Sequence, residues 1–374
     1  EHEKNQGRKV LNVPNLRFPE FQGEWEKCTL EDVINFSTTR VNSSELNKDN
    51  YVSTENMLQD YQGIVKAKSV PEDVNVVSFS CGDVLISNIR PYLKKVWKAT
   101  FNGGCSSDVF VLKANDNIES DYLHYVIAND KFINFVMSGT KGVKMPRGDK
   151  KQMETYSLSL PQIQEQHKIA RLLSLLDERI ATQNKIIDKL QSLIKGLRVS
   201  LMQIENGNIV HLGEIAQIYQ PQTISSTELT EDGFLVYGAN GIIGKYKQYN
   251  NKTEQICITC RGNTCGMVNY TKPMSWITGN AMVINTDEHQ NKVCKRYLYH
   301  YLSVYNFNSI ISGSGQPQIV RTPLEQLKVP LPTFLEQKQK ATFLDKIQGK
   351  IEISNKTLNL YLQQKQYLLR QMFI

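Results

Sequence analysis

Two segments in the first half of the chain have the side chains that bind nucleic acid. The segment "RPYLKKVWK" supplies Arg90, Tyr92, Lys94 and Lys95, and the segment "KGVKMPRGDKK" supplies Lys141, Lys144, Arg147, Lys150 and Lys151. Arginine and lysine bind phosphate groups, and arginine also forms paired hydrogen bonds with guanine. We therefore expect both segments to contact a polyanion, with duplex DNA as the leading candidate.

The second half of the chain presents a different set of polar residues in comparable segments. The segments "YGANG", "CRGNTCG" and "SGSGQPQIVRT" supply Asn240, Arg261, Asn263, Gln316, Gln318 and Arg321. Asparagine and glutamine pair with adenine, and nearby glycines let backbone amides approach phosphates. We expect this half to contact DNA as well, at different bases.

These segments lie in a tandem duplication. The stretch "LPQIQEQHKIA" at 160–170 returns as "LPTFLEQKQKA" at 331–341, with an offset of 171 residues that continues through the helix that follows. Each half has a globular block, then "LP", then a long helix, and such repeats define the architecture. We predict globular domains at 1–160 and 205–332 and helices at 161–204 and 333–374.

The first long helix has the pattern of a coiled coil. From Ile169 onward its apolar residues recur with a period of 3.5, whereas the second helix shows the same pattern interrupted at Lys340 and Lys365. The second globular domain connects the end of one helix to the start of the other, so the helices must pair antiparallel. The polar positions Gln183 and Ser354 should then share one layer and help to set the register. The alternative is that each helix packs only on its own globular domain.

The globular domains have mixed secondary structure. Alternating apolar residues predict strands at 76–80, 109–112 and 255–259, and helical periodicity appears at 121–137 and 294–311. The predicted fold class is therefore α+β: two similar mixed α/β domains separated by a long antiparallel two-helix coiled coil, with pseudo-two-fold symmetry. The topology of each domain does not follow from the sequence.

Composition excludes several classes of protein. The formal net charge is +7, which permits a polyanionic partner, and no apolar run is long enough to span a membrane. The polar start lacks a secretion signal, so we expect a cytoplasmic protein without a membrane partner. The sequence contains neither the Pro-Pro pair of an adenine methyltransferase motif nor a phosphate-binding P-loop, so we expect no catalytic residues and no cofactor in this chain.

The seven cysteines are odd in number, which favours free thiols over disulfides. Cys257, Cys260 and Cys265, with Cys294, could form a zinc site. Residues three apart on a strand point to opposite faces, however, and the first half has no matching group. We therefore favour buried free thiols and expect no metal.

The chain resembles the specificity subunit of type I restriction–modification systems. The resemblance rests on "GEWEKCTLEDV" at 23–33, "GDVLISNIRPYLKK" at 82–95 and the two "LP…EQ" helix openings, and it covers the chain from about Leu16 onward. It implies two target-recognition domains, each reading half of a bipartite DNA sequence, and two spacer helices. It also implies two methyltransferase subunits carrying S-adenosylmethionine, and motor–nuclease subunits that use ATP and Mg²⁺.

In that family this subunit is non-catalytic, and methyltransferase helices could cover Lys340 and Lys365. A second hypothesis is a coiled-coil scaffold whose globular heads bind other proteins rather than DNA. A third is an enzyme that performs its own methyl transfer. The first and second hypotheses differ in the salt dependence of binding, and the third requires binding of S-adenosylmethionine by the chain alone.

Overall fold

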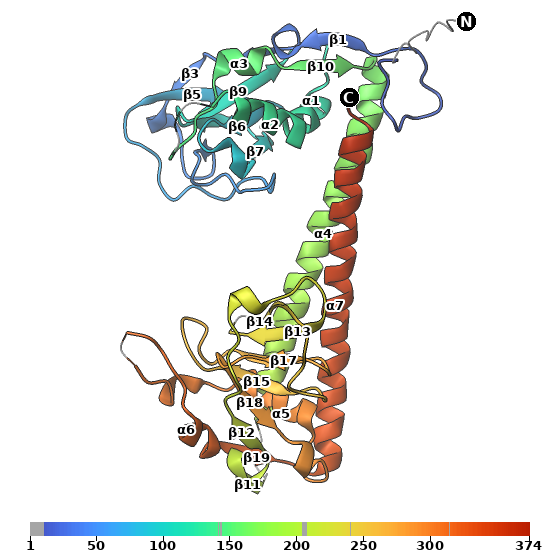
Figure 1. Ribbon diagram of the computed structural model, residues 1–374. Coiled ribbons are helices and arrows are strands. Elements are labelled where there is room, and N and C mark those ends of the chain that lie inside the picture. The colour runs from blue at the N-terminus through green and yellow to red at the C-terminus, as the bar shows by residue number, and fades with distance from the viewer. Residues whose placement is uncertain (1–10, 141, 143, 204–207, 240, 314) are drawn as a thin grey trace, which may run out of the picture. The chain divides into compact units, whose positions relative to one another are not determined.

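The computed structural model describes residues 11–374 except 141, 143, 204–207, 240 and 314. Its contacts divide the chain into two compact units (Figure 1). Unit 1 contains the chain up to Thr182 together with Leu358–Ile374, and unit 2 contains Gln183–Thr357. Each unit therefore combines one mixed α/β region with part of both long helices.

Unit 1 is built from short strands and three short helices. Its strands are β1 (Glu26–Thr29), β2 (Ile34–Phe36), β3 (Arg40–Asn42), β4 (Tyr51–Val52), β5 (Asn75–Phe79), β6 (Val84–Ser87), β7 (Val96–Lys98), β8 (Gly103–Cys105), β9 (Val109–Ala114) and β10 (Ser157–Leu160). Its helices are α1 (Ser120–Ile127), α2 (Asp130–Ser138) and α3 (Lys150–Glu154), with 3-10 turns η1 (Leu30–Asp32), η2 (Ser43–Glu45) and η3 (Pro91–Leu93). The strands form two four-stranded sheets, ordered β2-β9-β6-β7 and β3-β5-β8-β4, and the pair β1-β10.

Unit 2 has a closely related set of elements. Its strands are β11 (Asn208–His211), β12 (Gln217–Tyr219), β13 (Phe234–Gly238), β14 (Gly241–Tyr246), β15 (Ile256–Thr259), β16 (Val268–Tyr270), β17 (Trp276–Ile277), β18 (Ala281–Asn285) and β19 (Lys328–Leu331). Its helices are α5 (Lys295–Leu302) and α6 (Arg321–Glu325), with 3-10 turns η4 (Leu212–Glu214), η5 (Ser226–Glu228), η6 (Asp287–His289) and η7 (Phe307–Ser309). The sheets are ordered β12-β18-β15-β16 and β14-β13-β17, with the pair β11-β19.

The duplication seen in the sequence is therefore a duplication of topology. In each unit the second strand of an antiparallel pair, β1-β10 or β11-β19, leads into a long helix. The four-stranded sheet β2-β9-β6-β7 of unit 1 corresponds strand for strand to the sheet β12-β18-β15-β16 of unit 2. The inner strands β6 and β15 are buried at all four positions, which explains their continuous apolar and small residues. The two units are related in fold, as the repeat predicted.

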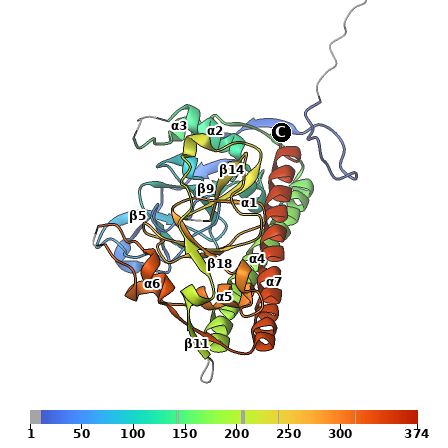
Figure 2. The same ribbon diagram turned by 60° about the horizontal axis from the view of Figure 1, so that its bottom comes forward.

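The long helices α4 (Ile163–Met202) and α7 (Phe334–Gln371) lie side by side and run antiparallel in each unit (Figures 1 and 2). In unit 1, Lys365 Nζ lies 2.6 Å from Asp177 Oδ1. In unit 2, Lys340 Nζ donates to the Leu201 carbonyl at 2.9 Å, near the opposite end of α4. Residue numbers in α7 thus increase as the numbers of their partners in α4 decrease, which confirms the antiparallel prediction.

The predicted polar layer is present in unit 2. Gln183 Nε2 donates to the carbonyl oxygen of Ser354 at 3.0 Å, so the acceptor is backbone rather than the serine hydroxyl. That these residues share a layer is confirmed, and their role in setting the register stays a prediction. The two lysines that interrupt the apolar pattern also have partners inside the chain, the Leu201 carbonyl and Asp177. No partner helix is needed to explain why Lys340 and Lys365 are tolerated.

The repeated "LP…EQ" segments place a buried glutamine at each helix start. In unit 1, Gln166 is 1% exposed, and its Nε2 donates to the carbonyls of Pro161 at 3.0 Å and Asn117 at 3.1 Å. Its Oε1 accepts from the Glu119 amide at 2.8 Å. One side chain therefore connects the first turn of α4 to the residues that open α1.

The same arrangement recurs in unit 2. Gln337 is 1% exposed, its Nε2 donates to the carbonyls of Pro332 at 3.0 Å and Lys292 at 3.2 Å, and its Oε1 accepts from the Cys294 amide at 2.8 Å. We name these two sets of three hydrogen bonds the amide clamps. They explain why the motif occurs twice: each copy fixes a long helix to its own globular region.

Unit 2 has an additional polar contact between α5 and the long helices. Arg198 Nε donates to His300 Nδ1 at 3.1 Å, and the other ring nitrogen, Nε2, lies 2.8 Å from Asp345 Oδ1. Because Nδ1 accepts a hydrogen bond, Nε2 carries the proton and donates to the carboxylate. Arg296 Nε also donates to Asp345 at 2.9 Å, and its guanidinium lies 4.2 Å from the ring centre of Tyr270.

The neutral state of His300 predicts a loss of stability in acid. Burial lowers its pKa, as do Arg198 and Arg296, although Asp345 opposes them. The folded pKa lies below the unfolded value of about 6.5, so the stabilising contribution is present above that pH and declines as pH falls below it. We expect the protection factors of unit 2 amides, which compare the observed exchange rate with the intrinsic rate at the same pH, to fall as pH drops below about 6.5. His300→Gln should reduce that fall in protection, and an unchanged pH dependence in this variant would contradict the assignment.

Candidate nucleic-acid interface

In unit 1 the two predicted basic segments are held together by backbone hydrogen bonds. The Arg90 amide donates to the Pro146 carbonyl at 2.8 Å, and the Gly148 amide donates to the Asn88 carbonyl at 2.7 Å. Between them, Ile89 and Arg147 form an antiparallel bridge. The segment that follows β6 and the segment that precedes α3 are therefore joined into one two-loop platform.

Unit 2 joins its corresponding segments in the same way. The Gly262 amide donates to the Pro317 carbonyl at 3.0 Å, and the Ile319 amide donates to the Cys260 carbonyl at 3.0 Å. Arg261 and Gln318 form the bridge between them. The segments "CRGNTCG" and "SGSGQPQIVRT" thus form a second two-loop platform after β15 and before α6.

The exposed candidates in unit 1 lie on or beside its platform. Arg90 is exposed and has a left-handed backbone conformation (φ 50°), Tyr92 is 48% exposed, and Lys144 and Lys151 are exposed. The side chain of Arg147 is 54% exposed and pairs with Asp108 at 3.0 Å. These residues have the exposure that contact with DNA requires.

Three of the predicted lysines have partners inside unit 1. Lys94 Nζ lies 2.7 Å from Asp130, and Lys95 Nζ donates to the Thr54 carbonyl at 2.5 Å. Burial lowers the pKa of Lys95, assisted by Arg90. Lys150 Nζ lies 4.7 Å from the ring centre of Phe36 and 3.9 Å from Glu154. The amino group of Lys95 is therefore bound within the chain, and those of Lys94 and Lys150 each lie near a carboxylate.

The candidates in unit 2 are also exposed where the structure describes them. Arg261, Asn263, Gln316 and Gln318 are exposed on the two loops. Arg321 is exposed and donates from Nε to Glu325 at 2.6 Å, one turn along α6. Lys141 and Asn240, which the sequence also singled out, lie outside the described residues.

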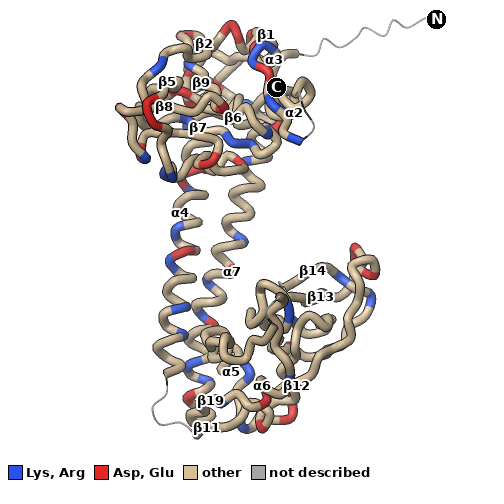
Figure 3. Tube along the Cα trace, turned by 90° about the vertical axis from the view of Figure 1, so that its left-hand side faces the viewer, with Lys and Arg blue, Asp and Glu red and all other residues tan. Residues whose placement is uncertain are grey.

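Charge alone does not mark the interface. Basic positions are interspersed with acidic ones over both units and along both long helices (Figure 3). The net charge of +7 therefore does not by itself identify the platforms as an interface. The case for the platforms rests instead on their paired loops and exposed side chains.

Comparison with known proteins agrees with this architecture. The family model of the type I restriction modification DNA specificity domain matches the chain twice, over residues 22–192 and 205–362. The chain belongs to this type I specificity family.

Individual members of the family are distant in sequence. The chain is similar to the type I restriction enzyme MjaVIII specificity subunit of Methanocaldococcus jannaschii, with 27% identity over 68% of this chain and 69% of that protein. It is also similar to the putative MjaX specificity subunit of the same organism, with 26% identity over 93% of this chain and 92% of that protein.

The fold is shared with a solved structure of the family. The S subunit of the type I restriction–modification system from M. genitalium superposes with a TM-score of 0.68 at 17% identity, covering 97% of this chain and 99% of that one. At this identity the likeness establishes the fold. The predicted family and the α+β fold class are thus confirmed.

The sequence prediction missed two polar residues beside the platforms of this specificity-family chain. The Asn88 amide donates to the Asp108 carbonyl at 3.0 Å, and the Cys260 amide donates to the Asn280 carbonyl at 2.9 Å. Asp108 and Asn280 each immediately precede a buried strand, β9 or β18. Aligning the two halves through those strands would have found them as matched positions.

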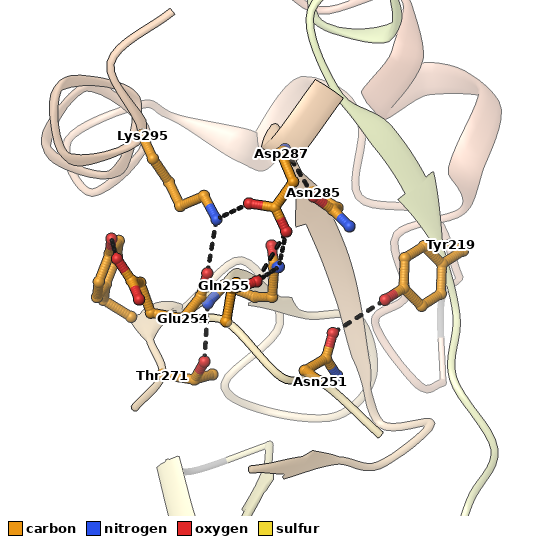
Figure 4. Close-up of polar contacts among 10 residues, drawn as sticks. Tyr219, Asn251, Glu254, Gln255, Thr271, Asn285, Asp287 and Lys295 are labelled. Carbon is orange, nitrogen blue, oxygen red and sulfur yellow. Dashed lines mark hydrogen bonds and ion pairs between the residues drawn. The ribbon is translucent and has the colours of Figure 1, made fainter. Parts of the chain in front are cut away.

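A second polar cluster in unit 2 is structural. Lys295 Nζ donates to Asp287 Oδ1 at 2.6 Å, and Gln255 Nε2 donates to Asp287 Oδ2 at 2.8 Å (Figure 4). Burial acts to raise the pKa of Asp287, but the hydrogen bonds from Lys295, Thr253 and Gln255 outweigh it, and the pKa is lowered. Because the carboxylate is already satisfied within the chain, this cluster joins α5 to the sheet rather than forming a reactive site.

The cysteines do not form a metal centre in the described part of the chain. All seven are free, Cys257 and Cys260 are buried, and the described residues contain no group of three or more histidine, cysteine or carboxylate side chains placed to hold a metal ion. Burial raises the pKa of Cys257 to about 12, so its thiol is protonated and unreactive at neutral pH. Among the described residues, every helix is too short or too polar to cross a lipid bilayer.

Proposed function

We propose that this chain is the DNA-recognition subunit of a type I restriction–modification complex. In this proposal each unit reads one half of a bipartite sequence in double-stranded DNA through its two-loop platform. The observation that carries it is the recurrence of the platform in both units, with the same backbone bonds and different exposed side chains. Membership of the specificity family supports the same function.

The proposal also assigns roles to the long helices. They would fix the unread gap between the two half-sites and provide docking sites for two methyltransferase subunits. Large apolar side chains exposed along them support docking: Leu175, Ile186, Leu193, Val199, Phe343, Ile353, Leu360, Leu362 and Tyr367. Exposed apolar surface of this kind is typical of interaction sites.

Catalysis would belong to the partners. We propose that this chain has no catalytic residue and no cofactor of its own, and that the methyltransferase subunits bind S-adenosylmethionine. Motor–nuclease subunits would use ATP and Mg²⁺, and the complex would act on DNA in the cytoplasm. If the chain performed methyl transfer itself, the purified chain without partners would turn over S-adenosylmethionine.

Methylation mapping tests the proposal directly. Cells that carry this chain with its methyltransferase should acquire methylation at one motif made of two short specified halves and an unread gap. Exchange of residues 205–332 for the corresponding region of another family member should change one half only. A motif without a gap, or a change in both halves, would contradict independent reading by the two units.

Salt dependence separates DNA reading from the scaffold alternative. We expect the affinity of the assembled methyltransferase for a duplex containing the mapped motif to fall steeply as salt rises, with a slope of about −0.9 per phosphate contacted. Fluorescence anisotropy at several salt concentrations gives this slope. A scaffold whose heads bind proteins would show no preference for the mapped duplex over a scrambled one.

A further inference from the structure

The two platforms place different side chains at one equivalent position. Arg147 in unit 1 and Gln318 in unit 2 each follow a proline whose carbonyl accepts from the opposite loop. Each forms the antiparallel bridge with that loop, Arg147 with Ile89 and Gln318 with Arg261. Both side chains are exposed. The backbone therefore holds position 147 and position 318 in the same local setting while leaving the side chain free to vary.

A second pair of equivalent positions, Asp108 in unit 1 and Asn280 in unit 2, also differs between the units. Asp108 and Asn280 are equivalent, because the carbonyl of each accepts from the segment after the buried strand, Asn88 or Cys260. In unit 1 the side chains form a charged pair, with Arg147 Nη1 donating to Asp108 Oδ1 at 3.0 Å. In unit 2 both positions carry neutral amides, Gln318 and Asn280.

The ion pair between Arg147 and Asp108 contributes little to the stability of unit 1. The side chain of Arg147 is 54% exposed and that of Asp108 is 32% exposed, and ion pairs at such positions contribute little to stability. The pair does restrict the guanidinium. With Nη1 held by Asp108, Nε and Nη2 remain as donors in a fixed plane.

These donors match one base. Arginine binds guanine through two parallel hydrogen bonds to O6 and N7, and glutamine binds adenine by accepting from N6 and donating to N7. We propose that position 147 in unit 1 and position 318 in unit 2 determine base specificity, with Arg147 reading a guanine and Gln318 reading an adenine. Asp108 is then a positioning residue that orients Arg147. This inference rests on the proposed function and names residues within the proposed interface.

Methylation mapping of single substitutions tests the inference in the complete complex. Arg147→Gln should replace or relax one guanine in the half-site read by unit 1, and Gln318→Arg should replace or relax one adenine in the other half-site. Discrimination at the affected base should fall about ten- to a hundred-fold, and the other half-site should stay unchanged. Arg147→Lys, which keeps the charge but loses the paired donors, should also relax the guanine. Asp108→Asn should weaken discrimination at that same guanine and at no other base.

Matched controls lie away from the platforms, on β9 in unit 1 and at the end of the turn η6 in unit 2. Lys113→Gln, near the end of β9, removes one positive charge from unit 1, and Gln290→Arg, after β18, adds one to unit 2. Neither should change the motif. Because both test positions are exposed, the variants should fold, and a thermal melt of the assembled methyltransferase confirms this. The effects of Arg147→Gln and Gln318→Arg are expected in different half-sites, so each variant tests the inference independently of the other.

Four results have distinct meanings. Loss of one specified base in the expected half supports the inference. A uniform fall in methylation at an unchanged motif, rescued by Arg147→Lys, would identify a phosphate contact and overturn it. If the unsubstituted chain produced no bipartite motif, the proposed function itself would fail, whereas an intact bipartite motif in all variants would refute only the role of these positions.

Discussion

Replacement of Gln337 by leucine is expected to expose the Cys294 amide to solvent exchange and to loosen α7 from the globular region of unit 2. The substitution removes all three hydrogen bonds of the amide clamp from a side chain that is 1% exposed. The amide of Cys294 and two carbonyls then lose their partner in a buried setting, at a cost of about 2–4 kcal/mol. Site-resolved hydrogen exchange measures this as a loss of protection at residue 294.

The duplicated clamp provides a matched comparison. Gln166→Leu should produce the same loss at the Glu119 amide in unit 1 and leave Cys294 protected. Gln364→Leu changes an exposed glutamine on α7 and should alter neither amide. If Cys294 stayed protected in Gln337→Leu and Glu119 stayed protected in Gln166→Leu, the clamps would not be what holds the helices.

Replacement of Asp345 by alanine is expected to destabilise unit 2 by about 2–4 kcal/mol, because a carboxylate that satisfies two buried or half-buried groups is removed. His300 is completely buried and would lose its acceptor, while Arg296 would lose its carboxylate partner and keep its contacts with Tyr270 and Tyr299. The side chain of Asp345 is 32% exposed, which places the effect below that of a fully buried pair. Denaturant-dependent hydrogen exchange of α5 amides measures the change.

A nearby exposed acid gives the control for this experiment. Glu352→Ala on the same helix removes one negative charge at an exposed position, and no shift in α5 exchange is expected. The double variant Asp345→Ala, His300→Leu should recover part of the lost stability, since the unpaired imidazole is then absent. If the double variant were no more stable than Asp345→Ala, the unpaired histidine would not be the source of the cost.

The sequence predicted the architecture because the relevant signals are periodic and duplicated. The offset of 171 residues marks both long helices, and their observed starts at Ile163 and Phe334 lie close to the predicted 161 and 333. Predicted strands at 76–80, 109–112 and 255–259 correspond to β5, β9 and β15. The domain boundaries themselves stay a prediction.

The helix predicted at 121–137 was wrong as a single element. The structure ends α1 at Ile127 and begins α2 at Asp130, because the Asn129 side chain accepts from the Lys131 amide and caps a new helix. Likewise α5 ends at Leu302, and Asn306 caps the separate turn η7. The apolar periodicity continues across these breaks, so it does not show where one helix ends and the next begins.

The sequence indicated the segments of the candidate interface but not which of their side chains have partners inside the chain. The basic and amide-rich segments were visible in the sequence, and the structure joins them in pairs as two platforms. Which lysines are occupied internally depends on partners far along the chain, such as Thr54 for Lys95 and Asp130 for Lys94. Local composition does not single out Asp108 and Asn280, and only an alignment of the two halves through β9 and β18 marks them as matched positions.

Both platforms are tied across their two loops by main-chain hydrogen bonds, so the ties do not depend on which side chains the tips carry. Substitutions at the tips therefore leave the supporting framework intact. If the platforms read DNA as we propose, a chain built this way acquires a new target by exchanging a few surface residues, with no need to repack its interior. Under the same proposal, combinatorial libraries restricted to those tips would redirect methylation one half-site at a time.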